Sequence, residues 1–71
     1  MKKLYKNQKY SLYEIQIRLN LSAITLYNYA RGKRDIDTMQ IGTLLGIAHI
    51  ENIEPMELYK QIKKYQKEGR K

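Results

Sequence analysis

The sequence contains no cysteine, one histidine, one proline and four glycines in 71 residues. Without cysteine there can be no disulfide bond, and no group of residues has the spacing of a zinc site. Neither kind of cross-link can stabilise the chain, so helix packing or a partner subunit has to do so. The length suits one small domain with a modest core.

Long apolar runs are also absent. The longest lies at residues 44–48, where Gly46 interrupts it, and a membrane-spanning helix needs about 20 apolar residues. The N-terminus, beginning Met1-Lys2-Lys3-Leu4, lacks the apolar stretch of a signal peptide. We therefore expect a cytoplasmic protein with no membrane partner.

Acidic residues are scarce: there are 7, against 14 lysines and arginines, which gives a net charge of +7. The charge is unevenly distributed, with +7 over residues 1–34, −4 over residues 35–55 and +4 over residues 56–71. A basic first half favours an anionic partner, above all nucleic acid. Solubility alone is the alternative explanation of the charge.

No long segment alternates apolar and polar residues with a period of two, so the pattern predicts an all-α fold. We expect a single compact five-helix domain over residues 1–68, followed by a basic tail over residues 69–71. The expected helices span about Lys2–Lys9, Leu12–Leu19, Ala23–Arg31, Thr38–Ile50 and Pro55–Gln66.

Residues that favour helix ends support these boundaries. Ser11 and Glu14 have the spacing of a capping box at the start of the second helix. The remaining signals are Asn20 and Gly32 as helix stops, Ser22 as an N-cap, Asp37 as an N-cap with Gln40 as its partner, and Pro55 at a first helical position.

The helix predicted over Ala23–Arg31 carries two different faces. One face has the core-forming residues Ala23, Leu26, Tyr29 and Ala30, and the opposite face has Ile24, Tyr27, Asn28 and Arg31. Only residues 20–22 separate this helix from the preceding one, so the two helices have to cross steeply, as in a helix-turn-helix. That geometry projects the second helix from the surface, where it fits the major groove of DNA.

The chemistry of the outer face suits that use. Asn28 can pair with an adenine edge, Ile24 can contact a thymine methyl group, and Tyr27 can contact a base edge or the sugar-phosphate. Arg31 can bond to guanine or phosphate, and the Lys33–Arg34 pair just beyond the helix can neutralise phosphates.

The stretch "LNLSAITLYNYARGKR" resembles the lambda-repressor-like, xenobiotic-response-element-type helix-turn-helix regulators, and the resemblance extends from about Lys2 to Leu58. It implies a small bacterial or phage transcriptional regulator of the repressor type. It further implies that the bases are faced by Ser22, Ala23, Ile24, Tyr27 and Asn28, and the DNA backbone by Ser11, Tyr13, Arg31, Lys33 and Arg34. The sequence departs from the family at Gln16, Asn20 and Ala30, where alanine, glycine and an acidic residue are usual.

A single recognition helix covers only a few base pairs, so we expect a homodimer on a two-fold symmetric site. The last two predicted helices carry more apolar residues than one small core needs. The expected interface is therefore Ile47, Ile50, Leu58, Tyr59 and Ile62. Packing of these two helices against each other within one chain is the competing explanation.

Other functions have weaker support. His49 has no cysteine or paired acid at useful spacing, so we expect no catalytic residue, no metal site and no cofactor. Gly42 and Gly46 suit close helix contact, because no phosphate-binding loop surrounds them. The Ile24 face can also be the contact surface of a protein-binding module, such as a phage-type inhibitor, and a basic amphipathic last helix can lie on a membrane.

Overall fold

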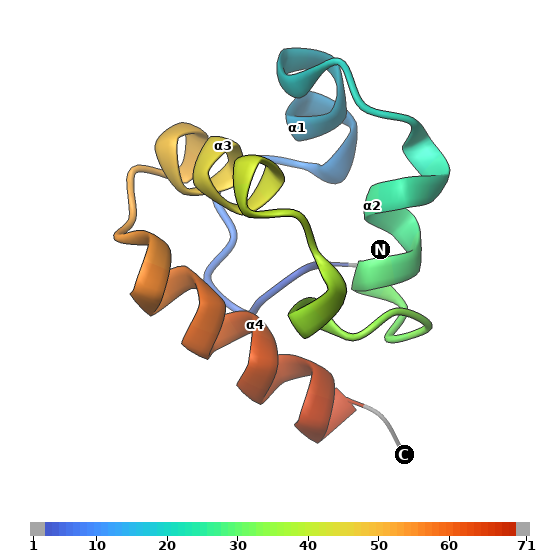
Figure 1. The fold of residues 1–71 in the computed structure, drawn as a ribbon, viewed down its shortest axis with the longest axis vertical. Helices are drawn as coiled ribbons and strands as arrows, with labels where there is room; N and C mark the ends of the chain where they lie inside the picture. The colour runs from blue at the N-terminus through green and yellow to red at the C-terminus, as the bar shows by residue number, and fades with distance from the viewer. Residues whose placement is uncertain (1–2, 70–71) are drawn as a thin grey trace.

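A computed structural model describes residues 3–69 of the chain. Within that range the protein is all-helical, without a strand, and measures 30 × 24 × 21 Å. The elements are α1 (Leu12–Leu19), α2 (Ala23–Ala30), the short 3-10 helix η1 (Ile36–Thr38), α3 (Ile41–Glu51) and α4 (Pro55–Gly69) (Figure 1). The expected all-α class and the compact shape are confirmed.

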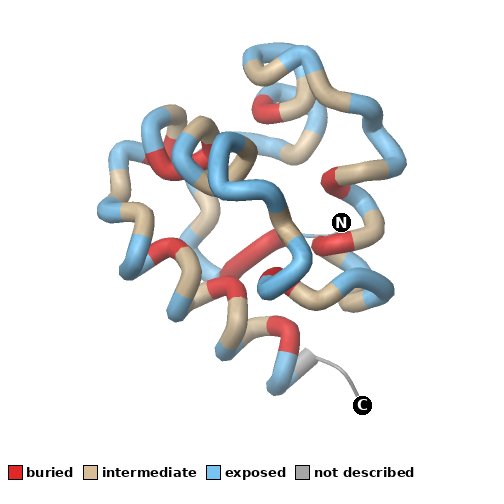
Figure 2. The backbone as a smooth tube through the Cα atoms, in the orientation of Figure 1, coloured by how far each residue is buried: buried red, intermediate tan, exposed pale blue. Residues whose placement is uncertain are grey.

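The core forms where the four α-helices meet. α1 packs against α2 and α3, α3 packs against α4, and α4 also contacts η1. The buried positions of the helices face inward, and much of α2 is exposed along the edge of the molecule (Figures 1 and 2). The buried apolar residues are Leu4, Tyr5, Ile15, Leu26, Tyr29, Ile36, Ile47, Ala48, Leu58 and Ile62.

Several predicted helix boundaries are confirmed. The Ser11 Oγ accepts a hydrogen bond of 3.1 Å from the Glu14 backbone N–H and so caps α1. Asn20 ends α1 in the left-handed conformation, with φ 55°, and Gly32 follows α2 with φ 78°. Pro55 is the first residue of α4, where its missing N–H costs nothing.

The helix predicted over about Lys2–Lys9 is wrong over the part that the structure describes. Residues 3–10 form turns and extended chain. Leu4 and Tyr5 are both buried, and contacts distant in sequence hold them there, such as the hydrogen bond from the Tyr5 hydroxyl to Glu51. Their neighbours also use side chains as hydrogen-bond partners: the Leu4 N–H donates to Gln8 Oε1 at 2.6 Å. Side-chain and long-range hydrogen bonds therefore determine the path of this segment.

The start of the fourth predicted helix also needs correction. Asp35, not Asp37, is the N-cap, and it caps η1 by accepting a hydrogen bond of 2.9 Å from the Asp37 N–H. The α-helix itself begins only at Ile41, after Gln40. The last helix is longer than expected and ends at Gly69, so the predicted tail over residues 69–71 begins within α4 and otherwise lies outside the described residues.

The predicted dimer interface is largely core. Ile47, Leu58 and Ile62 have no exposed surface within a single chain, and Ile50 and Tyr59 are half-buried against the same cluster. Packing of α3 on α4 therefore uses the apolar residues that had been assigned to a partner. Ile47, Leu58 and Ile62 therefore belong to the core of a single chain and are not accessible to a second copy.

Of the two glycines expected at close helix contacts, only Gly46 fits. A Cβ at Gly46 would lie 2.7 Å from Leu19 Cδ2, so its absence allows α1 and α3 to approach. A Cβ at Gly42 would meet nothing within 4 Å. Gly42 therefore has no packing role among residues 3–69.

Candidate nucleic-acid interface

α1 and α2 form a two-helix unit joined by three residues. The Leu21 N–H donates to the Gln16 carbonyl at 3.0 Å, which closes the end of α1. Ser22 occupies the N-cap position of α2 with extended backbone, but its side chain makes no capping hydrogen bond. Ser22 is exposed at the start of the helix, as a residue that contacts a ligand has to be.

The two predicted faces of α2 are present. Leu26 and Tyr29 are buried on the inner face, while Ile24 is 57% exposed and Tyr27 is 43% exposed on the outer face. Asn28 is half-buried. Ala23, assigned to the inner cluster by helical periodicity, is instead exposed at the first position of the helix.

A basic turn follows α2, over residues 31–34. The Asn28 carbonyl accepts hydrogen bonds from the backbone N–H groups of Lys33 (2.9 Å) and Arg34 (3.2 Å), so the turn folds back on the helix end. The guanidinium of Arg31 lies 5.4 Å from the centre of the Tyr27 ring. The guanidinium of Arg34 lies at the same distance from the Tyr29 ring. These cation–π contacts hold two exposed cations beside α2.

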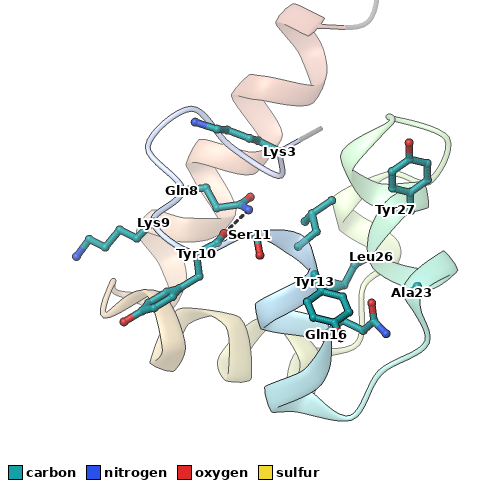
Figure 3. A pocket seen from close by; sticks show the side chains of 11 residues that line it. Lys3, Gln8, Lys9, Tyr10, Ser11, Tyr13, Gln16, Ala23, Leu26 and Tyr27 are labelled. Carbon is teal, nitrogen blue, oxygen red and sulfur yellow. Dashed lines mark hydrogen bonds between the residues drawn. The ribbon is translucent and has the colours of Figure 1, made fainter. Parts of the chain in front are cut away.

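A groove of about 610 Å³ runs between α2, the start of α1 and the N-terminal segment. Its labelled side chains come from these three parts of the chain (Figure 3). Tyrosine rings and lysine side chains line it together, a combination that suits contact with a sugar-phosphate chain. The lining residues are Lys3, Gln8, Lys9, Tyr10, Ser11, Leu12, Tyr13, Gln16, Ala23, Leu26 and Tyr27.

Two of the predicted backbone-contacting residues lie in this groove. Tyr13 is 69% exposed and Ser11 is exposed at the start of α1. Gln16, which stands where the resembled family usually has alanine, is half-buried and lines the same groove. The longer side chain is therefore accommodated without separating the two helices, which remain packed.

The N-terminal wall of the groove is fixed by a buried carboxylate. Glu51, at the end of α3, has no exposed surface. Its Oε1 accepts hydrogen bonds from the Tyr5 hydroxyl (2.5 Å) and the Lys9 N–H (2.7 Å), and its Oε2 accepts one from the Tyr10 N–H (2.9 Å). Burial raises the pKa of Tyr5, and the hydrogen bond to Glu51 and its charge raise it further. Tyr5 therefore remains a hydrogen-bond donor at any physiological pH.

The basic turn is fixed by a second buried polar residue, Gln66 of α4. Its Oε1 accepts a hydrogen bond of 2.9 Å from the Ile36 N–H. Its Nε2 donates to the carbonyls of Tyr29 and Arg34, both at 2.9 Å. One side chain thus joins the end of α2, the basic turn and η1, so α4 determines where the basic turn lies relative to α2.

An exposed cluster extends this contact between α4 and the chain after the turn. Lys63 Nζ lies 3.1 Å from Asp35 Oδ1 and 2.6 Å from Asp37 Oδ2, and the Tyr59 hydroxyl donates to Asp37. The Asp37 N–H and then Lys63 lower the pKa of Asp35, whereas Lys63 and then Tyr59 lower the pKa of Asp37. The hydrogen bonds to Asp37 and Asp35 raise the pKa of Lys63. All three groups are charged at neutral pH.

The sequence pattern had given Lys63, Glu51 and Gln66 no role. A signal for the two buried residues was present. Glu51 lies one turn after Ile47, and Gln66 lies one turn after Ile62, so each is a polar residue in line with an apolar face. A buried polar side chain needs hydrogen-bond partners, but the sequence does not say which backbone groups supply them.

Within residues 3–69, no group of three metal-binding side chains comes together and no helix is long and apolar enough to cross a membrane. Around α2, exposed tyrosine and basic side chains share one surface, among them Tyr13, Tyr27 and Arg31. Comparison with known proteins gives no matching family model, no matching curated protein and no matching solved structure.

Proposed function

We propose that the protein binds double-stranded DNA sequence-specifically, with α1 and α2 acting as a helix-turn-helix of the lambda-repressor-like type. The observation that carries this proposal is the composition of the exposed face of α2. Ile24 and Tyr27 are exposed on a helix whose other face is in the core, and Arg31, Lys33 and Arg34 are exposed at its end. A helix with these properties fits the major groove.

In this arrangement the start and outer face of α2 approach base edges. Ser22, with no capping bond of its own, and Ala23 lie at the start, where recognition helices contact bases. Ile24 supplies an apolar contact for a thymine methyl group, and Tyr27 and Asn28 supply polar contacts deeper along the groove. The protein acts as a small transcriptional regulator, of the repressor type that its sequence resembles.

Phosphate contacts flank the base contacts on both sides. Lys33 and Arg34 lie beyond the end of α2, and Ser11, Tyr13 and Lys9 line the groove at its other side. Since each neutralised phosphate releases counterions, the logarithm of the binding constant should fall with the logarithm of salt concentration by roughly 0.9 per phosphate contact. A flat response between low and moderate salt would exclude this mode of binding.

Selection of binding sites from random duplexes, with competitor DNA present, tests the proposal. We expect a consensus sequence that is rich enough to define at least one half-site. The Lys33→Ala variant serves as a control, because it should bind the same consensus more weakly. Recovery of duplexes without sequence preference, or of none, would overturn the proposal.

A protein-binding module is the second candidate, and one observation favours it. Ile17 of α1 is 58% exposed and Ile24 of α2 is 57% exposed, and exposed apolar residues on a small domain can mark a protein contact. The basic residues around α2 favour DNA instead. Absence of duplex binding, together with capture of an acidic protein that an Ile24→Glu variant no longer captures, would establish the second candidate.

We also propose that two copies bind one two-fold symmetric site. The chain measures 30 × 24 × 21 Å, and half-sites lie about 34 Å apart on one face of DNA, so two copies fit side by side. Two recognition helices would double the number of base pairs contacted. Sedimentation on a palindromic duplex should give two chains per duplex, and one chain per duplex would exclude the dimer.

A further inference from the structure

Two carboxylates lie directly beyond the basic turn. Asp35 follows Arg34 in the chain, and Asp37 lies two residues further, in η1. Their side chains are 43% and 52% exposed. In a protein that binds DNA through Lys33 and Arg34, two unpaired carboxylates at this position would repel the same phosphates that the turn attracts.

Lys63 contacts both carboxylates from the middle of α4. It lies 3.1 Å from Asp35 and 2.6 Å from Asp37, and Tyr59 donates a second hydrogen bond to Asp37. The three charged groups therefore carry a net charge of −1 in place of −2. Because Gln66, one turn further along α4, fixes the Arg34 carbonyl at 2.9 Å, the distance between this cluster and the basic turn is fixed too.

We propose that Lys63 is a positioning residue for DNA binding, which neutralises Asp35 and Asp37 beside the basic turn without contacting DNA itself. This inference rests on the proposed function. It assigns a role to the one lysine of α4 that forms an ion pair in the described part of the chain. Such a lysine changes the affinity for DNA because it changes the electrostatic potential at the basic turn. The number of contacts between the protein and phosphates stays the same.

Lys63→Met and Lys64→Met form a matched pair for the test. Both remove one positive charge from α4, but Lys64 is exposed and forms no ion pair among residues 3–69. We expect Lys63→Met to weaken binding to the selected duplex about two- to fivefold, because an uncompensated carboxylate then repels nearby phosphates through salt-screened solvent, and Lys64→Met to weaken it less. The dependence of binding on salt should keep the wild-type slope in Lys63→Met.

Asp37→Asn supplies the rescue. In the Lys63→Met background it returns the cluster to a net charge of −1, and affinity should return close to the wild-type value. Thermal melting followed by circular dichroism, in the same buffers, identifies the temperature range in which every variant is folded. Binding is measured within that range.

The outcomes separate this inference from the proposed function. A slope lowered by roughly 0.9 in Lys63→Met, without rescue by Asp37→Asn, would mean that Lys63 contacts a phosphate directly, which overturns the positioning role. Equal losses of affinity in Lys63→Met and Lys64→Met would mean that only the net charge of the protein matters, and this would overturn the positioning role as well. Unchanged affinity in Lys63→Met, with wild-type protein that binds, overturns this inference alone. Wild-type protein that binds no duplex overturns both proposals.

Discussion

Two irregular segments flank the α1–α2 unit, and they are held in different ways. Residues 3–10 are held by Glu51, a fully buried charged side chain that accepts three hydrogen bonds. Residues 31–37 are held by Gln66, a neutral buried side chain, and by the exposed cluster around Lys63. The first segment is therefore held by buried hydrogen bonds, and the loss of a buried hydrogen bond is costly. The second segment is held in part by exposed ion pairs, whose strength depends on salt concentration and pH.

The two segments are therefore expected to contribute differently to the free energy of unfolding and to the proposed DNA binding. The buried hydrogen bonds of Glu51 contribute to the free energy of unfolding, and they also fix the N-terminal wall of the groove. The mixed contacts of the second segment set the position and the charge of the basic turn, with less effect on unfolding. Substitutions in the two segments should therefore differ in which measurement they change most.

The largest effect is expected for Glu51→Ala. It leaves the Tyr5 hydroxyl and two backbone N–H groups without their acceptor, and each unsatisfied buried donor costs about 1–3 kcal/mol. We expect the free energy of unfolding to fall by about 3–5 kcal/mol in urea titrations. Glu54→Ala, at an exposed position three residues away, is the control and should change it by less than about 0.5 kcal/mol. Similar losses in both variants would contradict the account of Glu51.

Gln66→Ala should have the second-largest effect on stability. It removes three hydrogen bonds to the backbone at the end of α2, in the basic turn and in η1, and a loss of about 2–3 kcal/mol is expected. Gln61→Ala on the same helix removes only an exposed contact with Glu57 and should cost little. DNA affinity, measured where Gln66→Ala is still folded, should also fall, because the basic turn is no longer fixed. Unchanged affinity would show that Gln66 has a purely structural role.

The two serine N-caps offer a smaller and sharper comparison. Ser11 accepts a capping hydrogen bond from the Glu14 N–H, so Ser11→Ala should lower the free energy of unfolding by about 1 kcal/mol. Ser22 makes no such bond, so Ser22→Ala should act as an ordinary surface substitution and change it by less than about 0.5 kcal/mol. Urea unfolding measures both. A larger loss at Ser22 than at Ser11 would contradict the assigned caps.

The smallest effect on stability concerns the exposed cluster and depends on pH. Because the pKa values of Asp35 and Asp37 are lowered in the folded chain, their contribution is present above about pH 4, the ordinary carboxyl value, and is lost as pH falls through the lowered values. The raised pKa of Lys63 keeps its contribution throughout the neutral range.

The melting temperatures of the wild type and Lys63→Met measure this contribution. Their difference should be constant between about pH 5 and pH 9 and should shrink below about pH 4, where the carboxyl groups are protonated. A difference that stays constant down to about pH 2 would show that the ion pairs do not contribute.

Local signals predicted the helical part of the fold well. The Ser11 cap, the left-handed Asn20 and the Pro55 start depend on residues close in sequence, and the exposed face of α2 follows from helical periodicity. The path of residues 3–10 could not be predicted, because it depends on Glu51, more than 40 residues away. The burial of Ile47 and Ile62 within a single chain could not be predicted either. An apolar helix face does not reveal whether it packs against its own chain or against a partner, and only the packing of α3 on α4 decides this.

The proposed binding mode requires that α2 contacts bases while the turn after it contacts phosphates. The most direct test measures the affinities of Asn28→Ala and Lys33→Ala for the selected duplex and for its single-base variants. Asn28→Ala should lose about 1–3 kcal/mol of discrimination at one base pair, whereas Lys33→Ala should weaken binding to all duplexes equally. The same uniform loss in both variants would show that α2 does not contact bases, and would contradict the account.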